Sequence, residues 1–373
     1  MTAPRLEIDL DKVQHNARTL VRRLAQNDIT VTGVTKASLG SPSIARAMMG
    51  AGISTLGDSR IENIEALRRA NVAAELVLIR SPMISQVDRV VVASDVSYNS
   101  ELDIVDALSA AAKRADRRHG VVLMVELGDL REGIMPCDLE RSVAKVLRLP
   151  HIVLKGIGAN LGCRNGVVPD SRNMTELSAF ATHIESKFSI SLDVVSGGNS
   201  SNLSWALNTE NVGRINNLRL GEAILLGSDP LSGKALSGLY TDAIVLVAEA
   251  IESKTKPSMP WGDLAQSPFV NERPAASRGD ISQVILAVGH QDVDPGGLFA
   301  PPGIGIAAAS SDHLIIDAGR SVVDVGSEIR FKLDYSALLR AMTSPFVARV
   351  MKRNSRRAAS YRPLEEPDVL IAS

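Results

Sequence analysis

Lys36 is the residue of this sequence with the clearest chemical signature. It directly follows Thr30-Val-Thr-Gly-Val-Thr35, a run rich in β-branched residues and too short for a helix. A lysine at the end of such a buried strand is partly desolvated, and desolvation lowers the pKa of its amine. An amine with a lowered pKa is a nucleophile for carbonyl compounds. The sequence therefore predicts that Lys36 forms a Schiff base, with a strand-end salt bridge as the structural alternative.

Polar residues follow almost every later apolar run as well. In chain order they are Asp58, Arg60, Arg80, Asn99, Asp129, Arg131, Asn160, the segment Ser196-Gly-Gly-Asn-Ser-Ser201, and Arg219-Leu-Gly-Glu222. If the strands are parallel, these side chains gather at one edge of the sheet, where the active sites of barrel enzymes lie. We expect Asp58, Arg60 and Arg80 to be scaffolding at this rim, and Cys163 to be a small buried filler.

Two short segments could bind an anion. The small residues of Ser196–Ser201 expose backbone N–H groups, and a helix that begins near Ser201 would add a favourable dipole. Gly221 and the N–H of Glu222 could supply a second wall of a phosphate site. The chain lacks the glycine-rich nucleotide-binding motifs, and its six histidines show no metal-ligand spacing, so we expect no metal.

The elements that position these residues alternate between short apolar strands and helical patterns from about residue 10 to 235. The strand candidates are 30–35, 53–56, 76–79, 96–98, 121–126, 153–158, 192–195 and 216–220. Eight such units predict a (β/α)8 barrel of the α/β class, and a doubly wound open sheet is the competing architecture.

The pattern changes after residue 235. Strands are expected at 245–248, 284–288, 303–307, 314–317 and 328–332, with a loop over 256–279 and a helix over 344–357 capped by Ser344. This predicts a C-terminal, mostly β domain. The expected division is a barrel over residues 8–235, a β-rich domain over 236–358 that includes residues 1–7, and a tail over 359–373.

Composition narrows the classes of partner. The 373 residues carry 41 basic and 42 acidic side chains, and this near balance argues against nucleic acid or an anionic membrane as a partner. No stretch is long and apolar enough to span a bilayer, and the N-terminus lacks the apolar core of a signal peptide. Two cysteines are expected to be free thiols, so we expect a cytoplasmic protein.

The order of these motifs resembles the alanine racemase-like, fold type III enzymes that use pyridoxal 5′-phosphate (PLP). The matching segments are the strand before Lys36, Gly128-Asp-Leu-Arg-Glu-Gly133, Gly197-Gly-Asn-Ser-Ser201 and Leu218-Arg-Leu-Gly-Glu-Ala223. Three further runs look most like the ornithine racemase branch: Gly57-Asp-Ser-Arg-Ile-Glu-Asn63, Ser310-Ser-Asp-His313 and Leu333-Asp-Tyr-Ser-Ala-Leu-Leu339. The resemblance covers roughly residues 5 to 350.

The resemblance implies a role for each of these residues. Lys36 would carry PLP and act as one catalytic base, and Arg219 would bond the pyridine nitrogen. Asn199, Ser200, the backbone of Gly221 and Glu222, and Tyr335 would hold the cofactor and its phosphate. Arg131 would lie near the cofactor's phenolic oxygen and the substrate carboxylate. Asp312 and Ser311 would reach an amino-acid substrate from the second subunit of a head-to-tail homodimer.

An arginine beside the pyridine nitrogen also favours one reaction. Its permanent charge disfavours protonation of that nitrogen, so the cofactor becomes a weaker electron sink, which suits removal and return of the Cα proton. Fold type III decarboxylases instead place a carboxylate there. The sequence thus predicts a PLP-dependent racemase, an isomerase. The alternatives are a decarboxylase on the same scaffold and a non-catalytic PLP-binding protein.

The sequence departs from alanine racemases at three places. The tyrosine usually found after the lysine is absent from Lys36-Ala-Ser-Leu-Gly40, and Asn160 stands where a histidine is expected. Gly289-His-Gln-Asp292 replaces the run with the second catalytic tyrosine, so His290 is a candidate base or, equally, a structural or substrate-binding histidine.

These departures leave the substrate open. Ornithine or lysine fits the branch resemblance, and alanine remains an alternative. Asp292, Asp312 or Glu222 could pair with a cationic substrate tail, and each could also be a solvated surface acid.

Overall fold

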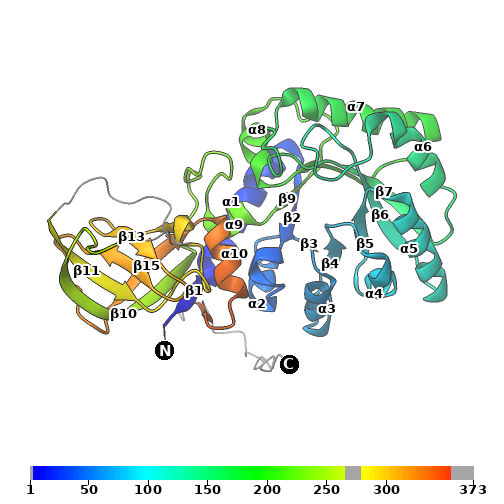
Figure 1. Ribbon diagram of the computed structural model, residues 1–373. Helices are drawn as coiled ribbons and strands as arrows, with labels where there is room; N and C mark the ends of the chain where they lie inside the picture. Colours follow the sequence, from blue (N-terminus) through cyan, green and yellow to red (C-terminus); the bar gives the residue numbers. More distant parts are fainter. Residues whose placement is uncertain (1–2, 265–278, 354–373) are drawn as a thin grey trace.

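The computed structural model describes residues 3–264 and 279–353. Its larger part is a closed barrel of parallel strands surrounded by helices (Figure 1). The barrel strands are β2 (Thr30–Val34), β3 (Thr55–Asp58), β4 (Glu75–Leu78), β5 (Val96–Asn99), β6 (His119–Met124), β7 (Ile152–Gly158), β8 (Val194–Gly198) and β9 (Asn217–Leu220). Because β9 pairs with β2, the sheet has no open edge, and the predicted (β/α)8 barrel is confirmed over the doubly wound alternative.

Helices cover the outside of this barrel; α1 precedes its first strand, and the others come after successive strands. They are α1 (Leu10–Leu24), α2 (Pro42–Met49), α3 (Ile61–Arg69), α4 (Val87–Ala93), α5 (Leu102–Arg114), α6 (Pro136–Val146), α7 (Ser171–Phe188), α8 (Leu203–Asn208) and α9 (Glu222–Leu226). Helix α1 shows why they form where they do. Asp9 caps it by accepting from the N–H groups of Asp11 and Lys12, and its apolar residues lie buried on one face.

The barrel interior holds a small apolar cluster of its own. Val77, Val96, Tyr98, Val122 and Met124 are buried there, separate from the large core between the barrel and its helices. Side chains therefore fill the barrel, and bound molecules can enter only at its ends.

The second part is an antiparallel sheet with the strand order β12-β15-β10-β11-β14-β13. Its strands are β10 (Ile244–Pro257), β11 (Asp280–Leu286), β12 (Leu298–Phe299), β13 (Gly305–Ala309), β14 (Leu314–Asp317) and β15 (Glu328–Leu333). Two strands from opposite ends of the chain extend it, since β1 (Arg5–Asp9) pairs with β10 and with β16 (Ala348–Lys352). The mostly β character of the C-terminal region is confirmed.

One predicted element is wrong. The expected helix over 344–357 is absent from its described part, where β16 lies instead, and the helix of this region is α10 (Tyr335–Thr343). Asp334 caps α10 by accepting from the N–H of Ala337, whereas Ser344 ends it. This segment forms a strand because its backbone pairs with that of β1, which lies more than 300 positions away in the sequence. Most of the predicted 256–279 loop and the 359–373 tail lie outside the described residues.

A buried carboxylate joins the two chain ends to the β-rich sheet. Glu7 on β1 accepts from both Arg5 Nε (3.0 Å) and Nη2 (2.8 Å), and it also pairs with Arg330 and with Lys352 Nζ (2.6 Å). Burial raises the pKa of Glu7, but hydrogen bonds from Arg330, Lys352 and Arg5 outweigh it and lower the pKa to about 2. Strands β1, β15 and β16 therefore share one charge cluster.

Replacing Glu7 by glutamine should lower the free energy of unfolding at pH 7 by about 3 kcal/mol, because three cations lose their shared anion. The wild-type carboxylate contributes fully above its ordinary pKa of 4.5, and this contribution disappears as the pH falls toward 2. Urea unfolding at several pH values measures both effects. Glu140→Gln, which removes an exposed partner of Lys187, is the control and should change nothing measurable. Equal stability of Glu7→Gln and wild type at pH 7 would refute the structural role.

Candidate active site

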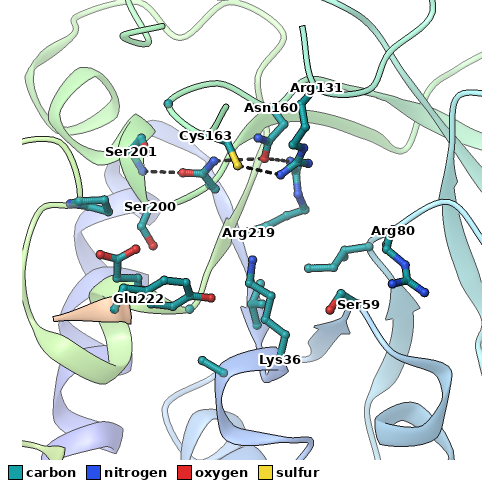
Figure 2. A pocket seen from close by; sticks show the side chains of 18 of the residues that line it. Lys36, Ser59, Arg80, Arg131, Asn160, Cys163, Ser200, Ser201, Arg219 and Glu222 are labelled. Atoms are coloured by element: carbon teal, nitrogen blue, oxygen red, sulfur yellow. Dashed lines mark hydrogen bonds between the residues drawn. The ribbon is translucent and has the colours of Figure 1, made fainter. Parts of the chain in front are cut away.

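A cavity of about 640 Å³ opens at the carboxyl ends of the barrel strands. Eight residues singled out from the sequence line it together, and most are visible in Figure 2: Lys36, Arg131, Asn199, Ser200, Arg219, Gly221, Glu222 and Tyr335. They come from the ends of β2, β8 and β9, from the loop after β6, and from α10 of the β-rich part. A volume of this size is typical of small-molecule sites, which range over roughly 300–1,000 Å³.

Lys36 begins a single 3₁₀ turn, Lys36–Ser38, directly after β2. Its amine lies 5.7 Å from the centre of the Tyr335 ring, and among the described residues no carboxylate forms an ion pair with it. Burial lowers the pKa of Lys36, and the nearby guanidinium of Arg131 lowers it further. The amine thus lies in the partly desolvated setting that the sequence predicted.

Asp58 holds the turn that carries Lys36 in place. This carboxylate is fully buried and accepts from the hydroxyl of Thr35 (2.7 Å), the N–H of Arg60 (2.9 Å) and the amide of Asn63 (3.0 Å). Helix α10 packs against the other side of the turn and brings Tyr335 to the amine. Asp58 and Arg60 therefore act as scaffolding and do not line the cavity.

Arg219 lies on the floor of the cavity and is almost completely buried. Its guanidinium donates to the hydroxyl of Ser196, to the carbonyl of Ala159 (2.9 Å) and to Oδ1 of Asn160 (3.3 Å). It also stacks over the Tyr98 ring at 5.1 Å, inside the barrel. These four contacts fix the orientation of the Arg219 guanidinium.

The turn after β8 and the start of α9, the two segments predicted to form an anion cup, lie beside each other at the cavity. Asn199 accepts from the N–H of Ser201 (2.8 Å) and donates to Asn160 Oδ1 (3.1 Å), which holds the turn Ser200–Asn202 in place. The hydroxyl of Ser200 accepts from the N–H of Ala223 (3.3 Å) and so joins this turn to α9. A side chain on Gly221 would come within 3.1 Å of Val34, so glycine keeps the backbone of β9 close to β2.

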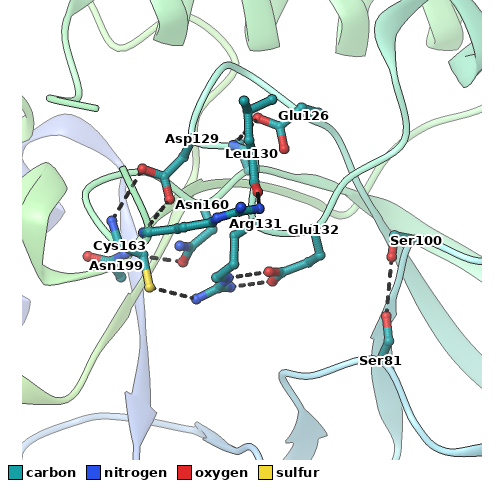
Figure 3. A network of polar contacts seen from close by, with 12 residues as sticks. Ser81, Ser100, Glu126, Asp129, Leu130, Arg131, Glu132, Asn160, Cys163 and Asn199 are labelled. Atoms are coloured by element: carbon teal, nitrogen blue, oxygen red, sulfur yellow. Dashed lines mark hydrogen bonds and ion pairs between the residues drawn. The ribbon is translucent and has the colours of Figure 1, made fainter. Parts of the chain in front are cut away.

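The loop after β6 holds Arg131 through a network that Figure 3 shows. Asp129 is buried and accepts from the N–H groups of the next rim loop, those of Cys163, Arg164, Asn165 and Val167. Glu126 accepts from the N–H groups of Gly128 (2.6 Å) and Leu130 (3.0 Å). Because these two carboxylates hold the loop in place, the side chain of Arg131 is kept at the cavity wall.

Among the cavity residues that the sequence missed or misjudged, three are informative. Glu132 was not singled out, yet its two oxygens accept from Nε and Nη2 of Arg131 and set the plane of that guanidinium. Cys163 is exposed and accepts from Arg131 Nη1 (3.2 Å), so its assignment as a buried filler is wrong. Arg80 lines the cavity as well. The position of Glu132 next to Arg131 was the one available signal.

Three of the predicted site residues lie outside this cavity. His290, Ser311 and Asp312 are on adjacent turns of the β-rich part, where the N–H of His290 donates to Ser310 (2.9 Å) and that of Gln291 to Ser311 (2.8 Å). They do not line the cavity of their own chain, but they lie close to one another.

Comparison with known proteins agrees with this geometry. Residues 8–229 match the family described as alanine racemase, N-terminal domain. The chain belongs to this family. An ornithine racemase from Acetoanaerobium sticklandii is 36% identical over 92% of this chain and 98% of its own length. A lysine racemase from Thermotoga maritima is 35% identical over 94% of this chain and 99% of its length. The family and the ornithine racemase resemblance predicted from the motifs are confirmed.

Solved structures share the fold of this family member at low identity. An alanine racemase from Streptomyces lavendulae has a TM-score of 0.72, with 19% identity over 94% of this chain and 98% of its own. The likeness covers both the barrel and the β-rich part. None of the helices in the described portion of the chain has the length and apolar character needed to cross a membrane.

Proposed function

We propose that the protein is a PLP-dependent amino-acid racemase that interconverts the L and D forms of a basic amino acid such as ornithine or lysine. One observation carries the proposal: a desolvated lysine amine and a fully held arginine face the same cavity, with an anion cup beside them. The names of the two relatives, which match nearly their whole length, support a basic substrate.

The cavity fits PLP on its own chemistry. Lys36 offers an amine without an ion-pair partner among the described residues, as a covalent attachment to an aldehyde requires. Nδ2 of Asn160 is buried beside Arg219 with no hydrogen-bond partner in the described structure, so it remains available to a bound group. Ser200, the N–H groups of Gly221 and Glu222, and the Tyr335 hydroxyl would hold the phosphate. Asn199 keeps the Ser200 turn in position.

When bound, PLP withdraws electrons from the α-carbon of an amino acid and makes its proton removable. The chain's residues then control that proton. Lys36, with its lowered pKa, would take or return it on one face. Arg131, held by Glu132, would bind the α-carboxylate and keep it in place, which disfavours decarboxylation.

Arg219 supports racemisation over the decarboxylase alternative. Its guanidinium is held by Ser196, Ala159 and Asn160 and stays charged, so a ring nitrogen beside it would remain unprotonated. An unprotonated ring would accept less negative charge, which would favour return of the proton to the α-carbon. A carboxylate in place of Arg219 would instead have favoured decarboxylation.

We further propose that His290, Ser311 and Asp312 complete the site of a second subunit in a head-to-tail homodimer. Their separation from the cavity of their own chain, together with their grouping on one face of the β-rich part, supports this arrangement. His290 would then be the base on the opposite face of the substrate, where an imidazole can act near neutral pH.

Incubation of the purified protein with PLP and single amino acids in deuterium oxide tests the reaction. Ornithine and lysine should acquire solvent deuterium at Cα in both enantiomers, because the proton is lost to and regained from exchangeable groups. The panel should include alanine, serine and arginine, and carbon dioxide release should be followed in parallel. Absence of Cα exchange with every amino acid would contradict the racemase proposal, and stoichiometric carbon dioxide would favour a decarboxylase.

Mixing two inactive variants tests the shared site. Lys36→Ala and His290→Ala should each abolish racemisation, whereas co-refolded mixtures should regain about a quarter of wild-type activity. Half of the randomly formed dimers are mixed, and each has one intact site that combines Lys36 of one subunit with His290 of the other. Full activity of His290→Ala alone, or no recovery in mixtures shown to contain mixed dimers, would contradict the arrangement.

A further inference from the structure

The carboxylates of the cavity differ in whether they are already paired. Among the described residues that line it, only Glu132 and Glu222 have carboxyl side chains. Both oxygens of Glu132 accept from Arg131. Glu222 is half-buried, and within the described ranges its side chain has neither an ion pair nor a hydrogen bond. Glu222 is therefore the cavity acid that can accept a cation from a ligand.

Its position within the cavity is also distinctive. Glu222 is the first residue of α9, directly after β9, whereas Arg131 comes from the loop after β6. Figure 2 shows the two side chains on different sides of the Lys36 amine. A substrate whose α-carboxylate meets Arg131 and whose α-carbon lies at Lys36 can extend its side chain toward Glu222.

The other acids that the sequence offered for a cationic tail are used elsewhere. Asp292 is buried in the β-rich part, where it accepts from the hydroxyl of Ser344 (2.9 Å) and the N–H of Gly289 (3.4 Å). Asp312 pairs with His313 (3.0 Å), is largely exposed and does not line the cavity of its chain. Neither is an unpaired acid that faces Lys36.

We propose that the Glu222 carboxylate binds the terminal ammonium of the substrate and thereby selects basic amino acids. This inference rests on the proposed racemase function and adds the residue that determines its specificity. The backbone N–H of Glu222 remains a wall of the anion cup, so one residue serves the cofactor with its main chain and the substrate with its side chain.

The electrostatics of the site agree with this assignment. Burial raises the pKa of Glu222 to about 7, although the Lys36 ammonium opposes the shift, and the charges of Asp334 and Asp229 add to it. A carboxylate in this setting is costly to ionise without a partner, and a bound ammonium would supply that partner. Beside a neutral side chain the carboxyl can keep its proton, so only a ligand with an ammonium gains the ion pair, and this gain gives the selectivity.

The test compares ornithine with norvaline, which has the same carbon chain but no terminal amine. In Glu222→Gln, kcat/KM for ornithine should fall roughly 10- to 100-fold, the usual effect of losing a charged hydrogen bond, while kcat/KM for norvaline changes less than about 3-fold. Glu132→Gln is the matched control from the same cavity. It acts through Arg131 on the α-carboxylate that both substrates share, so it should lower both values alike. PLP content, measured by absorbance after alkaline release, should stay stoichiometric in both variants.

Several results would overturn the assignment. An equal loss for ornithine and norvaline in Glu222→Gln, or loss of PLP from that variant, would give the side chain a cofactor role instead. A selective loss in Asp312→Asn but not in Glu222→Gln would place the ammonium site on the second subunit. Wild-type protein that racemises norvaline as well as ornithine would refute the inference and leave the racemase function intact. Inactivity of the wild type toward every amino acid would instead refute the function.

Discussion

The Lys36 amine shares one cavity with the guanidinium groups of Arg131 and Arg219, and the rest of the site follows from that arrangement. Burial removes the water that would stabilise an ammonium at this position, and Arg131 and Arg219 repel it as well, so the pKa of Lys36 falls. Such a cluster of cations is tolerated because other groups hold each one: Glu132 for Arg131, and Ser196, Ala159 and Asn160 for Arg219. Lys36 has neither an ion pair nor a side-chain hydrogen bond among the described residues, which leaves its amine available for the proposed attachment of PLP.

The closed barrel makes this arrangement possible, because parallel strands deliver their carboxyl ends to a single rim. Rigidity at the rim comes from two buried carboxylates and one amide side chain, whose oxygens accept from backbone N–H groups. Asp129 joins the loops after β6 and β7, Asp58 supports the turn that carries Lys36, and Asn199 closes the turn after β8. The β-rich part contributes Tyr335 through α10, so the cavity is complete only when both parts of the chain are folded together.

Much of this organisation could be predicted from the sequence, since most barrel strands lie in short apolar runs that are followed by polar residues. The wrong predictions share a physical cause: the structure of each segment depends on a partner that is distant in the sequence. Strand β10 continues from Ala248 to Pro257 through polar residues because β11 pairs with its backbone. The helix assigned to 344–357 is instead α10, capped by Asp334, and β16 forms because β1 lies beside it. Glu132 and Cys163 are recognisable as cavity residues only once Arg131 has been placed between them.

The central claim is that an aldehyde cofactor is attached to one particular amine. Borohydride reduction of the protein reconstituted with PLP, followed by proteolysis and mass spectrometry, tests it most directly. The account predicts a stable pyridoxyl group on the peptide that contains Lys36, with the label absent from that peptide in Lys36→Ala. A label on another lysine, or no covalent label on a protein shown to be folded, would contradict the account.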